Sequence, residues 1–266
     1  MSQKEFADAI GVSFATINRI ENNKHAPSDF VIERIYDLAY ENKIRINSVI
    51  SDIFMETSKN IYFHGAKGDI ENEVDLFRSE EKIDFGVGFY LGESYKQASS
   101  FVSTSKKGSV YIFNFVHSKL KTLEFGVDVN WMLAICYYRN ALKEEHRNSK
   151  MVQEIIKKIE SADLIIAPIA DNSMYDIMNQ FANGQLTDIQ ASHCLSASNL
   201  GKQYVIKTDN ALKYLKPVAR LYLCEKEKKD ILLTKLQEDM VSNTKVDASK
   251  IKYRRQGKYI EELLGC

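Results

Sequence analysis

Hydrophobic residues recur at helical spacing in three short segments at the start of the chain. The apolar residues between Phe6 and Ile10 share one face, and Ser2 and Glu5 have the spacing of a capping box. Gly11 then supplies the residue without a side chain that a tight turn needs. The sequence therefore predicts three helices, which run from Ser2 to Ile10, from Ser13 to about Glu21 and from about Ser28 to Tyr40.

The pattern changes at residue 60, after a segment without proline or glycine that predicts a helical connector. Short runs of β-branched and aromatic residues alternate there with stretches of helical period. The predicted strands are Ile61–Phe63, Val110–Val116, Leu164–Ala167, Gln203–Lys207 and Val218–Cys224. The predicted helices are Glu93–Val102, Trp131–His146, Met151–Ser161, Tyr175–Phe181, Thr187–Leu195 and Ala211–Leu215. The body is therefore predicted to be α+β, and the apolar run 131–138 to be a core helix.

Composition excludes several classes of protein. The 266 residues include 36 basic and 36 acidic side chains, so the whole surface does not attract nucleic acid or an acidic membrane. No apolar run approaches the roughly 20 residues of a membrane span. The four cysteines are scattered without metal-ligand spacing, so we expect reduced thiols, no metal and a cytoplasmic location.

The first 38 residues resemble the helix-turn-helix of phage-repressor-like DNA-binding domains. The resemblance rests on Gln3, Phe6, Ala7, Ile10, Gly11, Val12, Ser13, Thr16, Ile17, Ile20, Glu21, Asn22 and Pro27. It implies that the second helix enters the major groove and that DNA is faced by Gln3, Ser13, Thr16, Asn18 and Arg19. Residues 1–44 carry five basic and seven acidic side chains, which leaves open a second use of the module in protein contacts or dimerisation.

Three stretches of the body carry candidate chemistry. They are Tyr62–Gly65, Phe85–Leu91 with the trailing Gln97, and Gln203–Ile206. In this order they resemble the ADP-ribosyltransferase superfamily, most closely its diphtheria-toxin and poly(ADP-ribose) polymerase branch, and the chain looks like an uncharacterised bacterial family of that superfamily. The resemblance implies a split β-sheet domain with helical insertions over residues 60–224.

The same resemblance implies a site that binds NAD as a substrate. His64 is expected to hydrogen-bond the adenine-side ribose, Gly65 to pair with the carboxamide, and Tyr90 to stack on the nicotinamide ring. The expected cofactor-binding set is His64, Gly65, Gly88, Phe89, Tyr90, Gln97 and Phe101, and the expected catalytic set is His64, Tyr90 and Gln203.

Gln203 stands where that branch usually has glutamate, and glutamine offers neither charge nor a base. Three consequences are open: mono-transfer to an acceptor that supplies its own nucleophile, assistance from a carboxylate, or NAD binding with little chemistry. The carboxylates considered are Glu93, Asp171 and Asp188. Gln203 would alternatively be a strand residue facing solvent. The polar stretch 184–202 is expected to contact the acceptor, and polymer elongation is not expected.

The predicted organisation is a helix-turn-helix module over 1–44, a helical connector over 45–59, a transferase-like domain over 60–224 and a charged helical extension over 225–266. The sequence thus indicates an NAD-dependent mono-ADP-ribosyltransferase acting on a protein or nucleic acid. It would be the toxin of a bacterial toxin–antitoxin or phage-defence system, with operator DNA and an antitoxin as further partners. The alternative is a catalytically weak NAD-binding transcriptional regulator. Five basic residues within 250–258 predict a solvated tail or a contact with nucleic acid or another partner.

Overall fold

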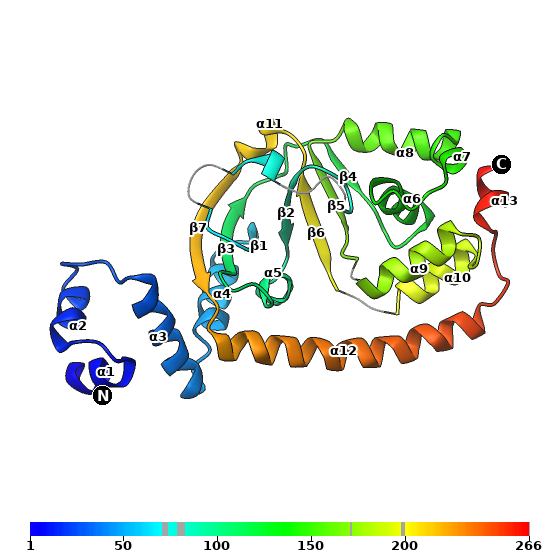
Figure 1. Cartoon of the computed structure of the whole chain (residues 1–266). Helices are drawn as coiled ribbons and strands as arrows, with labels where there is room; N and C mark the ends of the chain where they lie inside the picture. Colours follow the sequence, from blue (N-terminus) through cyan, green and yellow to red (C-terminus); the bar gives the residue numbers. More distant parts are fainter. Residues whose placement is uncertain (71–73, 79–82, 171, 198–199, 266) are drawn as a thin grey trace. The chain divides into compact units, whose positions relative to one another are not determined.

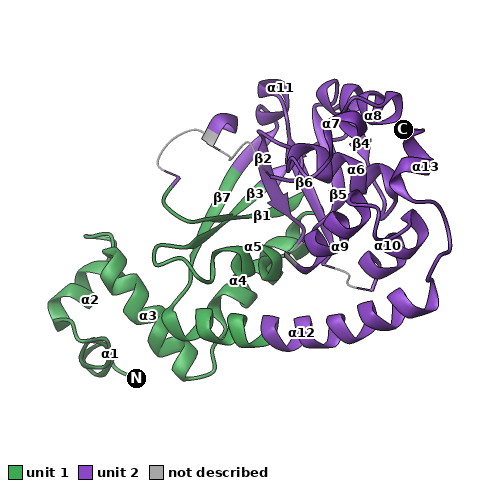
Figure 2. Ribbon diagram, turned by 45° about the vertical axis from the view of Figure 1, so that its right-hand side comes forward, with its two compact units in different colours: residues 1–69, 94–113, 217–234 green, residues 70–93, 114–216, 235–266 purple. Residues whose placement is uncertain are grey.

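The computed structural model describes residues 1–70, 74–78, 83–170, 172–197 and 200–265. The chain divides into two compact units, shown in different colours in Figure 2. Unit 1 contains residues 1–69, 94–113 and 217–234, and unit 2 contains residues 70–93, 114–216 and 235–266. Each unit is built from three separate stretches of the chain, so neither corresponds to one continuous segment.

The N-terminal part of unit 1 is a compact group of three helices. These are α1 (Gln3–Ile10), α2 (Phe14–Glu21) and α3 (Asp29–Glu41) (Figure 1). The Ser2 hydroxyl accepts a hydrogen bond from the Glu5 amide, and Gly11 adopts φ 72°, so the predicted cap and turn are both confirmed. Ala7, Ile10, Ile17 and Val31 form the buried centre of this group. The three helices were predicted within one residue at each end.

The remainder of unit 1 combines helices with strands. Its elements are α4 (Ile46–Thr57), β1 (Ile61–Ala66), α5 (Tyr95–Val102) and most of β3 (Ser109–Phe115) and β7 (Leu215–Tyr222). The prediction that this strand covers only Ile61–Phe63 and is ended by the pair His64-Gly65 was wrong, because β1 runs on to Ala66. Ile61, Phe63, Val102, Ile112 and Leu221 belong to one buried cluster that joins these elements.

Unit 2 is built around an apolar helix. Its helices are α6 (Val129–Tyr138), α7 (Glu144–Arg147), α8 (Lys150–Glu160), α9 (Asn172–Ala182), α10 (Asp188–Leu195) and α11 (Asp209–Leu212), with a 3₁₀ turn at Leu76–Arg78. All residues from Trp131 to Cys136 are buried, as the apolar run predicted. The single predicted helix 131–146 was wrong, because the chain turns after Tyr138 with Asn140 at φ 57° and α7 follows.

Seven strands form a mixed sheet in the order β4-β5-β6-β2-β1-β3-β7. The strands of unit 2 are β2 (Phe89–Gly92), β4 (Thr122–Glu124), β5 (Leu164–Pro168) and β6 (Lys202–Ile206). β4 pairs with β5 in parallel, whereas β6 pairs antiparallel with both β5 and β2. This register sets Gly92 opposite Gln203 and Tyr90 opposite Val205. The sequence pattern did not predict β4, which is only three residues long.

The chain ends in two further helices, α12 (Glu225–Lys252) and α13 (Ile260–Leu264). α12 is long but highly charged, whereas Ile260 of α13 is fully buried in the apolar core of unit 2. Among the described residues, no helix is both long and apolar enough to cross a membrane.

Candidate functional site

A buried acidic side chain, Asp84, lies at the centre of a polar network in unit 2. It stands in the loop that precedes β2 and is only 6% exposed. Its carboxylate accepts hydrogen bonds from side chains that three other segments supply: Arg139 after α6, Tyr175 in α9 and Gln203 in β6. A buried carboxylate is stable only when it is paired and hydrogen-bonded, and this network meets that requirement.

Gln203 has a fixed orientation in this network. Its amide nitrogen Nε2 donates to Asp84 Oδ2 at 2.9 Å and to the Pro168 carbonyl oxygen at 3.0 Å. Both partners can only accept, so the amide nitrogen must face them and the carbonyl oxygen Oε1 must point elsewhere. Gln203 is 7% exposed, which excludes the alternative of a strand residue facing solvent. The amide therefore has both hydrogens engaged, and Oε1 has no hydrogen bond to another described residue.

Arg139 and Tyr175 hold the opposite side of the Asp84 carboxylate. Arg139 donates to Asp84 Oδ1 from Nε at 3.1 Å and from Nη2 at 2.9 Å, and the Tyr175 hydroxyl donates to the same oxygen at 2.6 Å. The guanidinium also stacks over the Tyr175 ring, with its central carbon 3.4 Å from the ring centroid. The charge of Asp84 is therefore compensated by Arg139, and both oxygens of the carboxylate have defined partners.

The Tyr90 hydroxyl hydrogen-bonds the backbone of the loop that precedes β2. The hydroxyl donates to the Gly86 carbonyl oxygen at 2.7 Å and accepts from the Phe85 amide at 3.1 Å. Burial, followed by the negative charge of Asp84, raises the pKa of Tyr90 well above its usual value. The hydroxyl therefore stays protonated at neutral pH.

The glycine-containing loop is held from the other side by Lys207, a residue that sequence reasoning missed. Its ammonium donates to the carbonyl oxygens of Phe85, at 2.6 Å, and Val87. Burial lowers the pKa of Lys207 to about 8. A Cβ atom on Gly88 would lie 2.8 Å from the Ile206 carbonyl oxygen, so this glycine is required for the loop to pack on β6.

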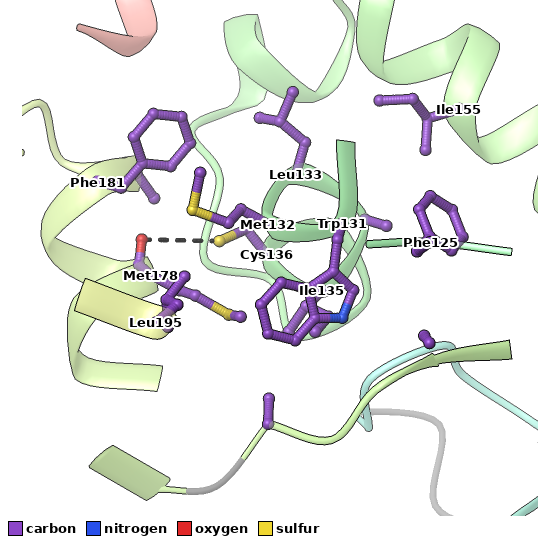
Figure 3. Close-up of a cluster of buried hydrophobic side chains, with 14 of the residues drawn as sticks. Phe125, Trp131, Met132, Leu133, Ile135, Cys136, Ile155, Met178, Phe181 and Leu195 are labelled. Carbon is purple, nitrogen blue, oxygen red and sulfur yellow. Dashed lines mark hydrogen bonds between the residues drawn. The ribbon is translucent and has the colours of Figure 1, made fainter. Parts of the chain in front are cut away.

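A pocket of about 180 Å³ adjoins the polar network, between α6 and α9. Its polar lining consists of Arg139, Tyr175 and Asn179, and its apolar lining consists of Ile135, Cys136, Ala141 and Met178. Figure 3 shows Cys136 among the buried side chains, where its thiol donates to the Met178 carbonyl oxygen at 3.7 Å. Burial raises the pKa of Cys136 to about 12, so this thiol is not a reactive nucleophile at neutral pH. The pocket thus offers a small apolar space with a guanidinium at its side.

Of the other residues expected to bind NAD, Phe89 is buried in β2 of unit 2 opposite Ile206, and the remaining four belong to unit 1. Gly65 is buried in β1, and a Cβ atom there would lie 2.4 Å from the Ala98 carbonyl oxygen, so the packing of α5 on β1 already requires a glycine. His64 is half-buried in the same strand. Gln97 completes a capping box at the start of α5 by accepting from the Ser94 amide. Phe101 is 62% exposed, and the Lys67 ammonium lies 5.2 Å from its ring centroid.

The carboxylates that the sequence suggested as helpers of Gln203 have other hydrogen-bond partners or lie outside the described residues. Glu93 accepts from the Lys202 amide at 2.7 Å, and Asp188 accepts from the Lys258 amide at 2.7 Å. Asp171 lies outside the described residues. The carboxylate that contacts Gln203 is Asp84, which sequence reasoning passed over. Its signal was its position as the only acidic residue in the run 84–92, directly before the glycine motif.

The residues expected to face DNA lie on α2 and the start of α1. The Gln3 amide donates to the Glu21 carboxylate and accepts from the Asn18 amide at 3.3 Å, so these side chains hold α1 and α2 together. Ser13 caps α2, and its hydroxyl lies 2.9 Å from that of Thr16. A hollow of about 310 Å³ is lined by two of the expected residues, together with two basic ones that follow them: Thr16, Arg19, Lys24 and His25. Arg19 therefore contributes to a locally basic surface within a module of net negative charge.

Comparisons with known proteins match two parts of the chain. Residues 1–35 match the family described as helix-turn-helix, and residues 60–216 match a family described as a protein of unknown function, DUF3990. No curated protein and no solved structure matches the chain. The second match covers more than half of the sequence and includes the glycine loop, Asp84 and Gln203. The chain therefore belongs to the DUF3990 family of proteins of unknown function.

Proposed function

We propose that this protein is a mono-ADP-ribosyltransferase that uses NAD as the donor and a macromolecule as the acceptor. The observation that carries the proposal is the fixed amide of Gln203, whose nitrogen is held by Asp84 and Pro168. This orientation leaves the carbonyl oxygen as a hydrogen-bond acceptor, which is what binding a ribose hydroxyl requires. The resemblance of the three sequence stretches to the ADP-ribosyltransferases supplies the reaction class.

Transfer breaks the bond between the ribose C1′ atom and the nicotinamide nitrogen. The bonding electrons leave with nicotinamide, which departs neutral, and positive charge develops on the ribose as in glycoside cleavage. The negative end of the Gln203 amide dipole stabilises this charge if it faces the ribose. A lone pair of the acceptor then forms the new bond to C1′, and the proton of the acceptor passes to water.

Asp84 acts through Gln203 in this scheme. Its carboxylate is compensated by Arg139 at 2.9 Å, so it contributes orientation rather than net negative charge. Gln203 cannot remove a proton, and the acceptor must therefore be a nucleophile without help from this side chain. These properties support transfer of a single ADP-ribose group and not chain elongation.

Tyr90 is assigned the binding of the nicotinamide ring. Its hydroxyl is occupied by Gly86 and Phe85, which fixes the ring plane without involving the hydroxyl in proton transfer. A fixed aromatic ring is suited to stacking, because little conformational entropy is lost when a planar ligand binds. The assignments of His64 to the adenine-side ribose and of Gly65 to the carboxamide are kept as part of the proposal.

The helix-turn-helix match favours a second candidate, a transcriptional regulator that binds NAD with little turnover. Gln203 supports this candidate as well, because an uncharged group stabilises an oxocarbenium ion less than a carboxylate does. In the transferase reading, the same module binds operator DNA and regulates synthesis of a toxic enzyme that an antitoxin neutralises.

The test is incubation of the purified full chain with NAD labelled on the adenine side, with and without cell lysate. Variants are Gln203→Ala, Tyr90→Ala and His64→Ala, and the matched control is Gln237→Ala at an exposed position of α12. Label on a macromolecule that is lost in the three variants but kept in the control supports the transferase. Release of free ADP-ribose without labelling indicates a glycohydrolase instead. NAD that binds but stays intact contradicts the transferase and favours the regulator.

A further inference from the structure

The basic run near the C-terminus belongs to a segment that is docked on α10 in unit 2. The side-chain amide of Gln190 donates to the Lys250 carbonyl oxygen at 2.7 Å. Asp188 and Lys258 exchange two further hydrogen bonds, from the Lys258 amide to the Asp188 carboxylate at 2.7 Å and from the Asp188 amide to the Lys258 carbonyl oxygen at 2.9 Å. The backbone of this segment is therefore fixed at both ends of the run.

Three further features hold the segment close to α10. The rings of Tyr253 and His193 stack with centroids 3.6 Å apart and an interplanar angle of 6°. Gly257 has φ 89°, and a Cβ atom there would lie 2.2 Å from Asp188 Oδ1, so only glycine allows this approach. Ile260 is fully buried beyond it. The run is therefore not a free tail, because its backbone is anchored on both sides.

The charged side chains of the run have no acidic partner among the described residues, although the Lys252 ammonium lies 5.1 Å from the centroid of the Tyr253 ring. We define the basic shelf as Lys250, Lys252, Arg254, Arg255 and Lys258. Among the described residues, none of these five side chains makes an ion pair or a side-chain hydrogen bond. Of the neighbouring acidic groups, Asp188 accepts from the Lys258 amide, Glu261 pairs with Lys143 at 3.7 Å, and Glu262 accepts from the Tyr259 amide at 2.8 Å. Asp247 lies one turn before Lys250 in α12 and is the acid that offsets part of the charge of the run. The shelf is thus a local excess of positive charge on a neutral chain.

Helix stability accounts for only part of this charge. Lys250 and Lys252 lie in the last turn of α12, where positive charge is favourable beside the helix C-terminus. Arg254, Arg255 and Lys258 lie beyond the helix and gain nothing from this effect. Arg255 also adopts φ 60°, a conformation that costs a non-glycine residue on the order of 1 kcal/mol. Arg255 thus occupies a backbone position that favours glycine.

We propose that the basic shelf binds the phosphate backbone of a nucleic acid. Its arginines present planar donors that suit phosphate oxygens, and its charges are held on an anchored backbone, so little backbone entropy is lost on binding. One face of the Tyr253 ring is covered by His193, which leaves phosphate contacts rather than base stacking as the main source of affinity. Binding is therefore expected to depend strongly on salt and weakly on sequence.

This surface is separate from the helix-turn-helix module and goes beyond the proposed NAD chemistry. α10, on which the segment with the shelf is docked, directly precedes the strand that holds Gln203 in the same unit. Taken together with the proposed transferase, the shelf selects nucleic acid as the acceptor class, and this extension rests on the proposed function. Binding of nucleic acid is measured without NAD. The proposed binding by the shelf and the proposed transferase activity are therefore tested in different assays, and the failure of one is distinguishable from the failure of the other.

The experiment measures binding of a fluorescent 20-nucleotide single strand of mixed sequence, and of its duplex, by anisotropy from 50 to 200 mM KCl. The full chain carries Arg19→Ala throughout, which weakens the contribution of the helix-turn-helix. The shelf variant is Lys252→Gln, Arg254→Gln, Arg255→Gln and Lys258→Gln. The control loses equal charge elsewhere in unit 2, through Lys119→Gln, Lys150→Gln, Lys157→Gln and Lys158→Gln at exposed positions.

The shelf variant is expected to bind single strands at least 10-fold more weakly at 100 mM KCl than its parent. The slope of log K against log salt should fall by about 0.7 for each of the four lost contacts. The control variant should keep the affinity and the salt slope of the parent. Equal losses in the two variants, or no loss in the shelf variant, overturn the proposal. So does binding of labelled polyglutamate at the shelf without binding of oligonucleotides, which would indicate an acidic protein partner. Should the fourfold variant unfold, the single variants Arg254→Gln and Lys258→Gln must each lower the slope.

Discussion

Replacing Gln203 with glutamate places a second carboxyl group beside Asp84. The amide nitrogen that it removes lies 2.9 Å from Asp84 Oδ2 and 3.0 Å from the Pro168 carbonyl oxygen. Both atoms are acceptors, so an ionised carboxylate makes neither hydrogen bond and meets a like charge. Gln203→Glu should therefore destabilise this chain.

The size of the effect follows from two terms. Two unit charges about 4 Å apart repel by about 4 kcal/mol at an effective dielectric constant of 20, and Arg139 offsets part of this. The alternative is protonation of the new carboxyl group, which costs about 1.4 kcal/mol per pH unit above its ordinary pKa of about 4.3, or about 3.7 kcal/mol at pH 7. The protonated acid regains one of the two hydrogen bonds. We expect a loss of about 3 to 4 kcal/mol in the free energy of unfolding at pH 7.

The deficit must depend on pH in one direction. The folded state raises the pKa of the new carboxyl group, so the unfolded chain releases its proton first as pH rises. The stability that the protonated carboxyl group contributes is therefore fully present below the pKa of the unfolded state, and it is lost as pH rises through the pKa of the folded state. Relative to wild type, Gln203→Glu should lose up to about 1.4 kcal/mol per pH unit between pH 5 and pH 7.

Urea denaturation of the full chain at pH 5, 6 and 7 measures this slope. Gln203→Met removes the hydrogen bonds without adding charge and should show a deficit that does not change with pH. Gln185→Glu, at an exposed position, should change stability by less than about 0.5 kcal/mol. Adding Asp84→Asn to Gln203→Glu should recover part of the loss, because the new amide donates to the new carboxylate. A deficit in Gln203→Glu that is absent or independent of pH would refute the arrangement of Asp84 and Gln203 described above.

Three further outcomes are expected. Gly88→Ala should lower the free energy of unfolding by about 1–3 kcal/mol, because its Cβ atom would lie 2.8 Å from the Ile206 carbonyl oxygen. The control Gly126→Ala, whose Cβ atom would have nothing within 4 Å, should change it little. Equal effects of the two substitutions in denaturant titrations would contradict the described packing of the loop on β6. Lys207 has a pKa lowered to about 8, so the unfolded state binds more protons than the folded state above that pH. The free energy of unfolding of wild type should therefore rise relative to that of Lys207→Met from pH 8 to pH 10. A difference between the two proteins that does not change with pH would count against burial of the ammonium. Arg19→Ala should weaken binding of the operator by about 1–3 kcal/mol in anisotropy without changing the melting temperature, and unchanged affinity would exclude this residue from the DNA surface.

Local sequence determined the elements that depend on neighbours along the chain. The capping box of Ser2 and Glu5, the turn at Gly11 and the ends of α1, α2 and α3 follow from hydrogen bonds and backbone preferences within a few residues. The apolar run beginning at Trp131 likewise fixed a core helix, because side chains of that kind are stable only when buried. Gln203 was singled out by the resemblance of its strand to the ADP-ribosyltransferases and not by a local pattern.

Tertiary structure decided the surroundings of that residue. Asp84 was not recognised because the partner that explains it, Gln203, is more than a hundred residues away, and no local pattern encodes a contact at that separation. Gly65 illustrates the same limit, since its lack of a side chain is required by Ala98 on another element and does not by itself indicate a ligand. Sequence thus determined many of the local structures that form. Only the packing of distant segments decided which acid meets which amide and which charges remain free at the surface, because burial and pairing set the energies of polar groups.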